Sequence, residues 1–361
     1  MVQSIFDAMS ASMGLWPTVL LFIGLGVAGL NYGADWLVNG ASNLGFRLGI
    51  SATMIGLTIV AFGTSAPELV VSLLTSMQGK PELCLGNVVG SNIANTALIL
   101  GATAVIFPLN IGRNSVVYDA PLSAMAIGTL FLLALIGATI SRLDGFLLLA
   151  VFAIWMTWLI RKTLRESANV RRERRELKEA RENGTLPESD DDDAEPHFHP
   201  RSPVIDLALI GVGLVVLVIS ADGLVAGAVA TAQALSVPDI VVGLTIIAGG
   251  TSLPELAVGM VAAFKHKADI TVGNVMGSNI FNALLIIGTC TVLAPISFDI
   301  SEFTWSGDAA TLFVDIPFCV FVCLLVIPMM RHGAKLTRFK GAILLSLYLG
   351  YLVALVLRNL P

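Results

Sequence analysis

The 361-residue sequence has few charged side chains: they make up 13% of it, against roughly 25% in soluble domains. Hydrophobic residues make up 55%, and the mean hydropathy is +0.83. This composition excludes an ordinary soluble domain and predicts a chain that crosses a membrane several times. The first residues also lack the basic segment and small-residue cleavage site of a secretory signal. We therefore expect the first span to direct its own insertion.

Cysteine and histidine are equally scarce, with four of each. The cysteines lie in or beside apolar runs and form no CxxC pair, so we interpret them as packing residues. The histidines lie in segments expected outside the spans. Zinc and copper sites, which prefer imidazole or thiolate, are therefore not expected. The sequence also shows no nucleophile with an adjacent base and no nucleotide-binding loop, so we expect no enzyme, no cofactor and no nucleic-acid partner.

What the sequence does contain is one unit that occurs twice. Segment 56–69 returns 187 positions later at 243–256, with 11 of 14 residues identical. The segment GNVVGSNIAN at 86–95 returns at the same offset as GNVMGSNIFN at 273–282. Asp35 and Asp222 keep this register further out, without an insertion. The repeat therefore covers most of each half of the chain.

Apolar runs of about 20 residues are long enough to cross the ~30 Å hydrocarbon core of a bilayer. Each copy contains five such runs, so we expect an all-α polytopic membrane protein with ten transmembrane helices. The first and sixth runs are the longest and are expected to tilt strongly. The predicted spans are 16–45, 50–77, 83–107, 116–140, 144–160, 204–235, 238–264, 270–293, 308–330 and 340–357.

Basic residues indicate the orientation, because cytoplasmic loops retain Lys and Arg. Apart from the long loop after the fifth span, the loops of one side carry eight basic residues and those of the other side three. Taking the richer side as cytoplasmic places both termini outside the cell membrane. Five spans per copy is an odd number, so the second copy must enter the membrane upside down. Such inverted repeats are typical of secondary transporters, whose site lies between the two copies.

The chain is expected to divide into three parts: a first five-helix repeat at 1–160, a cytoplasmic charged linker at 161–203, and a second, inverted repeat at 204–361. Basic and acidic residues four apart predict that the fifth helix continues through 165–182. The Gly, Pro and acidic residues that follow indicate a disordered tether. Weak cation binding by the acidic and histidine residues of this tether is the alternative.

Each copy places one glutamate, Glu68 or Glu255, deep inside an apolar span that has no Lys or Arg to pair with it. A charge at the bilayer centre costs roughly 2.5–3.5 kcal/mol on insertion scales. An unpaired, duplicated carboxylate brings no packing benefit in return. The compensating charge is therefore expected to come from outside the protein, as protons or as metal cations.

The residues around these glutamates supply neutral oxygens. Pro67 and Pro254 cannot donate to the helix ladder and are expected to free carbonyl groups at 61–64 and 248–251. The other asparagines of the motifs, Asn87, Asn92, Asn274 and Asn279, are interpreted as hydrogen-bonding residues between helices. An oxygen-only site suits Ca²⁺, which takes about six to eight oxygen ligands, and it suits Na⁺ as well. The side chains expected to form it besides the glutamates are Thr64, Ser65, Ser91, Asn95, Thr251, Ser252, Ser278 and Asn282.

At these residues the sequence resembles the cation/calcium exchanger superfamily, whose two repeats carry GTSxPE and GNxxGSNxxN elements, and in particular the prokaryotic sodium/calcium exchangers. The resemblance implies an antiporter that exchanges Na⁺ for Ca²⁺ by alternating access, with Ca²⁺ held centrally by Glu68 and Glu255. It implies that the glycine-rich first and sixth helices slide across the rest. One monomer is expected to be sufficient for transport, and the oligomeric state is left open. The atoms implied to complete the calcium and flanking sodium sites are the hydroxyls of Thr64, Ser65, Ser91, Thr251, Ser252 and Ser278 and the carbonyls of Ala61 and Ala248.

Two other functions stay open at this point. H⁺/Ca²⁺ antiport would use the same glutamates as proton carriers, whereas the surplus of neutral oxygens favours sodium. A cation channel would use the glutamates as a selectivity constriction, whereas inverted repeats favour alternating access. Asn95 and Asn282 stand where some members of the superfamily carry Asp, which leaves coupling to protons or potassium undetermined.

Overall fold

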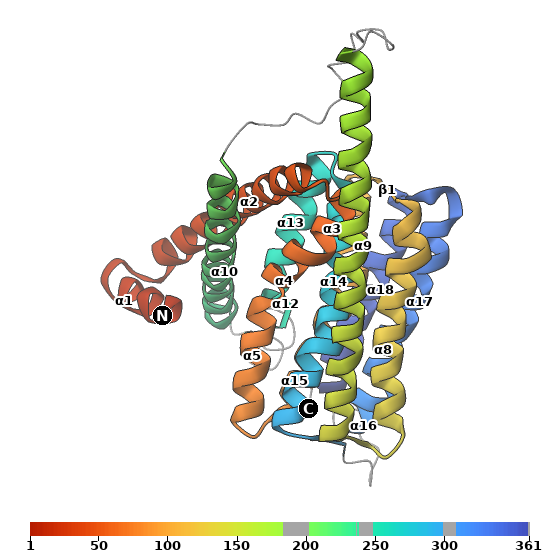
Figure 1. Cartoon of the computed structure of the whole chain (residues 1–361). Coiled ribbons are helices and arrows are strands. Elements are labelled where there is room, and N and C mark those ends of the chain that lie inside the picture. Colours follow the sequence, from red (N-terminus) through yellow and green to blue (C-terminus); the bar gives the residue numbers. More distant parts are fainter. Residues whose placement is uncertain (183–201, 236, 238–247, 299–307, 360–361) are drawn as a thin grey trace.

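The computed structural model describes residues 1–182, 202–235, 237, 248–298 and 308–359. Over these ranges the chain is a bundle of helices with two short two-stranded sheets (Figure 1). Eight of the described helices are long and apolar enough to cross a membrane, and one bent helix pair makes a ninth. The remaining predicted span, 238–264, is described only from Ala248 onward. The expected all-α polytopic fold is confirmed.

The first copy runs from α2 to α9. Three π-helical segments, labelled η, continue the α-helices without a break, whereas the chain bends by 42° at Ser65, between α4 and α5. The elements are α2 (Leu15–Leu48), α3 (Ala52–Ile55), η1 (Gly56–Val60), α4 (Ala61–Thr64), α5 (Ala66–Met77), α6 (Pro81–Ile93), η2 (Ala94–Ile99), α7 (Leu100–Ile106), η3 (Ser115–Asp119), α8 (Ala120–Leu135) and α9 (Arg142–Glu182).

The second copy follows the same plan, and its described part begins with a helix as long as α2. The elements are α10 (Pro203–Ala234), α12 (Ala248–Gly250), α13 (Leu253–Phe264), α14 (Ala268–Ile280), η6 (Phe281–Ile286), α15 (Ile287–Leu293), α16 (Asp308–Ala310), η7 (Thr311–Asp315), α17 (Ile316–Arg331), the short 3-10 helix η8 (His332–Ala334) and α18 (Arg338–Asn359).

Two antiparallel strand pairs show how the copies are related. Strand β1 (Leu109–Asn110) pairs with β4 (Lys335–Leu336), and β2 (Thr139–Ile140) pairs with β3 (Ile296–Ser297). β1 and β3 are equivalent in the repeat, 187 positions apart. Each pair therefore joins one strand from each copy, with the roles exchanged. A two-fold axis between the copies produces this arrangement, as expected for inverted repeats.

The central spans are buried and the first and sixth are peripheral. In the apolar stretches of these helices, 72% of α6–α7 and 83% of α14–α15 is buried, against 22% of α2 and 28% of α10. The glycines of α14 allow the first copy to approach closely. A Cβ atom on Gly273 would lie 2.4 Å from the Thr53 carbonyl oxygen, and one on Gly277 would lie 2.6 Å from that of Leu57. These contacts bring the two motifs together in the centre of the bundle.

The peripheral helices α2 and α10 pack tightly against each other. A Cβ on Gly33 would lie 2.9 Å from the Gly213 carbonyl, and one on Gly213 would lie 2.8 Å from that of Gly33. At one end of this contact the fully buried Asp206 forms an ion pair with Arg47, with Nε and Oδ2 3.3 Å apart, and accepts a hydrogen bond from Asn43 Nδ2 at 3.3 Å. These two glycines therefore lie between α2 and α10. They do not form part of a surface that slides across the rest of the bundle, which had been the expectation for these helices. The two helices form one unit.

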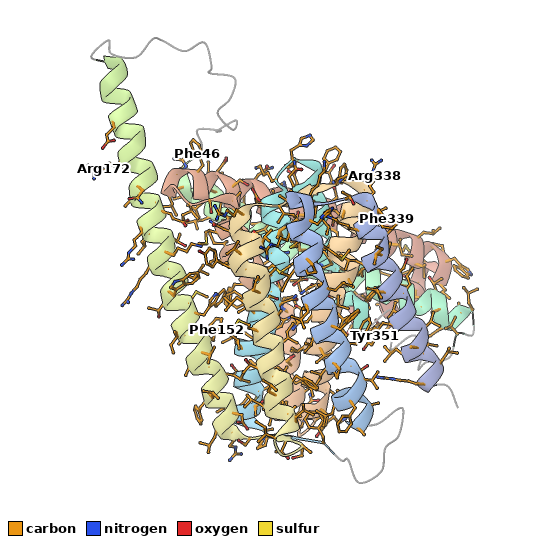
Figure 2. All side chains as sticks on the ribbon, turned by 90° about the vertical axis from the view of Figure 1, so that its right-hand side faces the viewer. Phe46, Phe152, Arg172, Arg338, Phe339 and Tyr351 are labelled. Carbon is orange, nitrogen blue, oxygen red and sulfur yellow. The ribbon has the colours of Figure 1, made fainter. Side chains whose placement is uncertain are left out.

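Helix α9 is 41 residues long and projects beyond one end of the bundle (Figure 1). Arg172, on the projecting part (Figure 2), bonds to Glu176 at 2.8 Å. The predicted continuation of the fifth helix through 165–182 is confirmed, whereas the tether from 183 onward lies outside the described residues. We call this end of the bundle the α9 face. The Ser167 hydroxyl donates to the Leu48 carbonyl there, which ties α9 to the end of α2.

A short helix that the sequence analysis did not predict, α1 (Val2–Met13), precedes the first span. Its 12 residues are too few to cross a bilayer, and no side chain caps its start, so the sequence carries no clear signal for it. The buried Phe6 packs edge-to-face on Phe22 of α2, with ring centroids 5.0 Å apart, and lies beside Ala226 of α10. α1 thus covers the ends of α2 and α10 that lie away from the α9 face.

Candidate cation-binding site

The two glutamates occupy matching positions at helix starts. Glu68 lies in the first turn of α5 and Glu255 in the first turn of α13, and each is 1% exposed. The preceding residues, Ser65 and Ser252, have ψ near zero and break the helical path. The free N–H groups of a helix start carry partial positive charge, which favours a carboxylate there. The helices thus supply part of the compensation that the sequence analysis assigned wholly to external cations.

The glutamates come from different copies but meet in the centre of the bundle. Their carboxylates are close enough to repel each other. No ion pair of the described residues involves either glutamate. Two like charges in a low-dielectric interior need a shared cation or a proton between them.

Neutral oxygens surround this pair. Of the twelve residues that the sequence analysis selected, nine carry a buried side-chain oxygen without a hydrogen-bond partner in the described structure. A buried oxygen of this kind costs about 1–3 kcal/mol unless something else satisfies it, and a hard cation does so. The nine are Glu68, Glu255, Ser65, Ser91, Asn95, Thr251, Ser252, Ser278 and Asn282.

Of the remaining three residues, Thr64 and Ala61 are already partly engaged. The Thr64 hydroxyl lies 3.2 Å from Asn274 Oδ1 and 3.4 Å from the Ala61 carbonyl, and it donates to one of them at a time. The Ala61 carbonyl also accepts from the Ser65 N–H at 3.0 Å. The break at Ser65 therefore does not free this carbonyl, and a cation would use its second lone pair. Ala248 is the first residue of α12.

Asparagines bond across the boundary between the copies. Asn282 Nδ2 donates to Asn92 Oδ1 at 3.0 Å, and Asn279 Nδ2 donates to Thr96 Oγ1 at 2.8 Å. The expected role of Asn92 and Asn279 between helices is confirmed. Because the amide nitrogen of Asn282 is held by Asn92, its oxygen stays directed away from that bond and free to bind a cation.

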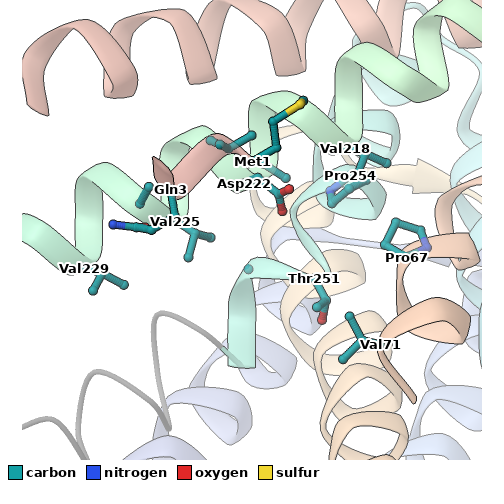
Figure 3. A pocket seen from close by; sticks show the side chains of 14 residues that line it. Met1, Gln3, Pro67, Val71, Val218, Asp222, Val225, Val229, Thr251 and Pro254 are labelled. Atoms are coloured by element: carbon teal, nitrogen blue, oxygen red, sulfur yellow. The ribbon is translucent and has the colours of Figure 1, made fainter. Parts of the chain in front are cut away.

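A pocket of about 430 Å³ reaches the motifs from the side of α10 (Figure 3). Its wall includes Pro67 and Val71 of α5, Asp222 and Val225 of α10, and Thr251 just before α13. Thr251 is also one of the residues with an unbonded buried oxygen. The pocket thus connects the surroundings of α1 with the motif residues.

The described residues hold no cluster of three or more His, Cys, Asp or Glu side chains that would bind a metal. His266 and His332 lie just beyond the ends of α13 and α17, outside the spans as expected, and His197 and His199 lie outside the described ranges. The four cysteines are free and buried, in agreement with a packing role. The oxygen chemistry of the central site is that of Ca²⁺ or Na⁺ and not that of a transition metal.

Two ion pairs between helices were not predicted. The buried pair of Arg47 and Asp206 joins α2 to α10, and a second pair joins Lys265, after α13, to Asp35 of α2. The sequence shows these charges near the ends of spans, but it does not show which of them meet. Each pair depends on how α2 is placed against the other helices.

Inverted helical repeats around a buried, oxygen-lined centre are the architecture of a membrane transporter. Comparison with known proteins specifies the class. The family model described as sodium/calcium exchanger protein matches residues 18–161 and 205–357. The chain therefore belongs to the sodium/calcium exchanger family, and its function is cation/Ca²⁺ exchange across a membrane.

Individual relatives agree with this assignment. The putative antiporter CaxA of Alkalimonas amylolytica is 33% identical over 92% of this chain and 96% of its own length. The sodium/calcium exchanger MaX1 of Methanosarcina acetivorans is 30% identical over 93% of this chain and 97% of its own. The solved structure of the sodium-calcium exchanger NCX_Mj soaked with 10 mM Na⁺ and zero Ca²⁺ superposes with a TM-score of 0.72 at 28% identity, over 93% of this chain and 98% of that one.

Proposed function

We propose that this protein exchanges Na⁺ for Ca²⁺ by alternating access and so extrudes calcium from the cell. The observation that carries the proposal is the burial of Glu68 and Glu255, one from each copy, at matching helix starts, together with buried neutral oxygens that have no partner among the described residues. The similarity to sodium/calcium exchangers supports Na⁺ as the counter-ion.

The charges of the site fit one divalent cation. Two carboxylates neutralise one Ca²⁺, and the asparagine and hydroxyl oxygens complete its coordination without adding charge. The same neutral oxygens give Na⁺ ions places to bind when Ca²⁺ leaves. Asn95 and Asn282 contribute amide oxygens to this set, and the carbonyls of Ala61 and Ala248 contribute backbone oxygens.

Alternating access requires that the site opens to one side at a time. The pocket beside Asp222 leads from the motif residues toward α1, whereas α2 packs against α13 on the way to the α9 face. Because α2 and α10 are held together by glycine contacts and by the pair of Arg47 and Asp206, they move as one unit. A shift of this unit along the rest of the bundle would close one passage and open the other.

The α9 face is assigned to the cytoplasm, because loops rich in Lys and Arg stay on the cytoplasmic side of a membrane. Arg47 and Lys265 lie at this face, as do the basic residues of the projecting part of α9. Both termini are then outside, and the passage beside Asp222 opens to the outside. The protein would lie in the cell (inner) membrane and act as a monomer, because one chain contains both copies of the motif.

Calcium uptake into liposomes tests the counter-ion. The purified protein is reconstituted, the vesicles are loaded with Na⁺, and the pH is clamped to the same value on both sides. We expect ⁴⁵Ca²⁺ uptake that requires the outward Na⁺ gradient and is lost when choline replaces Na⁺. Uptake that ignores Na⁺ and follows an imposed pH gradient would instead establish H⁺/Ca²⁺ antiport. Uptake that needs no counter-ion and does not saturate would establish a channel.

A further inference from the structure

Asp35 and Asp222 hold the same position in the two copies but have different surroundings. They lie 187 residues apart, in α2 and α10, the two helices of the peripheral unit. Neither belongs to the central site. The difference between their environments therefore reports which passage is open and what holds the other one closed.

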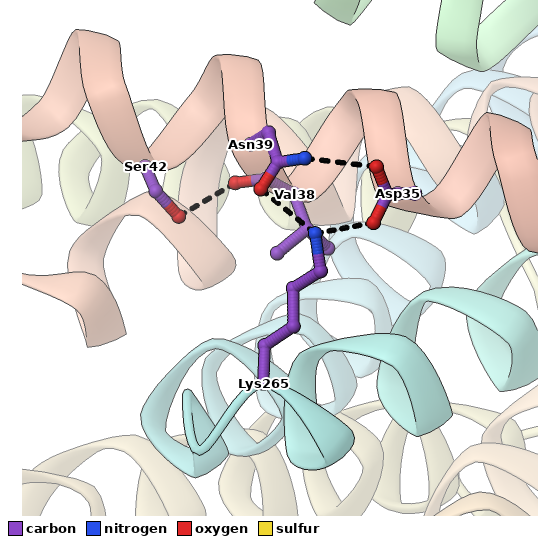
Figure 4. A network of polar contacts seen from close by, with 5 residues as sticks. All are labelled: Asp35, Val38, Asn39, Ser42 and Lys265. Atoms are coloured by element: carbon purple, nitrogen blue, oxygen red, sulfur yellow. Dashed lines mark hydrogen bonds and ion pairs between the residues drawn. The ribbon is translucent and has the colours of Figure 1, made fainter. Parts of the chain in front are cut away.

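Asp35 is held by a cation from the protein itself. Lys265, which follows the last residue of α13, forms an ion pair with Asp35 Oδ1 and donates to Asn39 Oδ1 at 2.8 Å (Figure 4). Asn39 Nδ2 in turn donates to Asp35 Oδ2 at 2.9 Å. The side chains of Lys265 and Asp35 are 25% and 37% exposed, so the pair is partly shielded from solvent. Burial and the charge of Lys265 lower the pKa of the neighbouring Lys267, and Asp35 offsets part of this effect.

Asp222 has no side-chain partner of this kind. It lines the pocket with Val225 and Thr251, and Met1 lies next to it (Figure 3). The α-amino group of Met1 is a positive charge that acts on Asp222, whereas no side chain of the described residues forms an ion pair with it. The positions equivalent to Lys265 and Asn39 are Gln78 and Ala226. The side-chain cation and the amide that hold Asp35 are therefore absent from the other copy.

Apolar residues beside the two aspartates show the same asymmetry. Val71 of α5 is 41% exposed and Val225 of α10 is half-buried, and both line the pocket. Their repeat equivalents, Val258 of α13 and Val38 of α2, are completely buried in one apolar cluster. The positions that line the open pocket in one place are thus buried at their repeat equivalents, between α2 and α13 toward the α9 face.

From this asymmetry we infer that Asp222 is the entry residue that attracts cations into the open passage, and that Asp35 is its counterpart for the passage at the α9 face. Lys265 acts as a tethered cation that occupies Asp35 and, with Asn39, latches α2 to α13 while that passage is closed. When the passage opens, Lys265 leaves Asp35, and the carboxylate faces entering Ca²⁺ or Na⁺. This inference rests on the proposed alternating access, but not on which cation drives it.

Cysteine labelling tests the latch. In a variant with all four native cysteines replaced by alanine, Val258→Cys reports on the α9-face passage and Val71→Cys on the other. A water-soluble maleimide is added to protein in detergent without an ion gradient. We expect Val71→Cys to react readily and Val258→Cys slowly. Lys265→Gln and Asp35→Asn should each raise labelling of Val258→Cys about three-fold, the effect of losing a partly exposed ion pair worth about 0.2–1 kcal/mol.

The matched control is Asp222→Asn, which removes the equivalent carboxylate and should leave labelling of Val258→Cys unchanged. Exchange of the two charges, Asp35→Lys with Lys265→Asp, should return the labelling to its original rate. Unchanged labelling in both single variants would overturn the latch. Because labelling needs no transport, it remains informative even if the counter-ion proves not to be Na⁺.

Transport kinetics test the entry role of Asp222. Asp222→Asn should raise about three-fold the Ca²⁺ concentration that gives half-maximal uptake when Ca²⁺ is added on the pocket side, without changing the maximal rate. Asp222→Glu keeps the charge and should behave like the original protein. A KM that stays the same in Asp222→Asn, or a fall in the maximal rate that Asp222→Glu shares, would show that the residue is structural.

Discussion

Replacing Glu255 by Gln removes one of the two central charges and keeps the shape of the side chain. Coulomb attraction is proportional to the charge of the bound ion, so Ca²⁺ loses twice as much as Na⁺. A pair of unit charges 4 Å apart is worth about 4 kcal/mol at an effective dielectric constant of about 20. The gross difference between the two ions is therefore about 4 kcal/mol. Relief of the repulsion from Glu68 and relaxation of the site reduce this difference in binding free energy.

If half of this difference remains, about 2 kcal/mol, Ca²⁺ binding weakens about 30-fold relative to Na⁺ binding. Titration calorimetry of the purified protein with Ca²⁺, and competition by Na⁺, measures both affinities. The control Glu82→Gln removes an exposed carboxylate at the start of α6 and should change neither. A Glu255→Gln variant that binds both ions with unchanged relative affinity would refute the charge argument, and one that retains full exchange would refute the central role of the pair.

Three further outcomes are expected. Gly277→Ala would place a Cβ 2.6 Å from the Leu57 carbonyl and should lower the free energy of unfolding by about 1–3 kcal/mol. The control Gly128→Ala, with open space around it, should not lower it. Equal melting temperatures of the two variants would contradict the close approach. Arg47→Met leaves the fully buried Asp206 with Asn43 but without its charged partner and should cost about 3–5 kcal/mol. Adding Asp206→Asn should restore most of this loss, and a stable single variant would contradict the pairing. If three Na⁺ replace one Ca²⁺, each cycle moves one charge across the membrane, with about 2.3 kcal/mol available per 100 mV. A potassium diffusion potential should therefore change ⁴⁵Ca²⁺ flux in liposomes. A flux that does not depend on voltage would mean two monovalent ions per Ca²⁺.

Much of the fold follows from the sequence because membrane spans and duplicated motifs are both local signals. The length of apolar runs gives the spans within a few residues, since the bilayer fixes the length of helix that must be apolar. The offset of 187 residues gives the repeat, and the odd number of spans per copy gives its inversion, which the pairing of β1 with β4 and of β2 with β3 shows directly. Helix α1 was missed because it is short and uncapped.

The candidate site was predictable in its composition but not in its bonding. Glu68 and Glu255 stand out because no basic residue shares their spans. Whether a given oxygen is free depends on which neighbour lies within about 3 Å of it, and this is a property of packing. The Ala61 carbonyl shows the difference, because it accepts from the Ser65 N–H in spite of the break that follows. The amide of Asn282, held by Asn92 of the other copy, shows it as well.

The open passage could not be predicted, because nearly identical motifs predict equal environments for both copies. In the structure the copies differ: Val258 is completely buried and Val71 is 41% exposed. Exchanging the conformations of the two copies would give the opposite state, with α10 closed against α5. Gln78 would then approach Asp222 in place of Lys265, so an amide would meet the carboxylate instead of an ammonium group. The closed α9 face thus has an ion pair that the other closed state lacks. Because a partly exposed pair is worth only about 0.2–1 kcal/mol, this asymmetry biases the equilibrium between the two states and leaves both accessible, as alternating access requires.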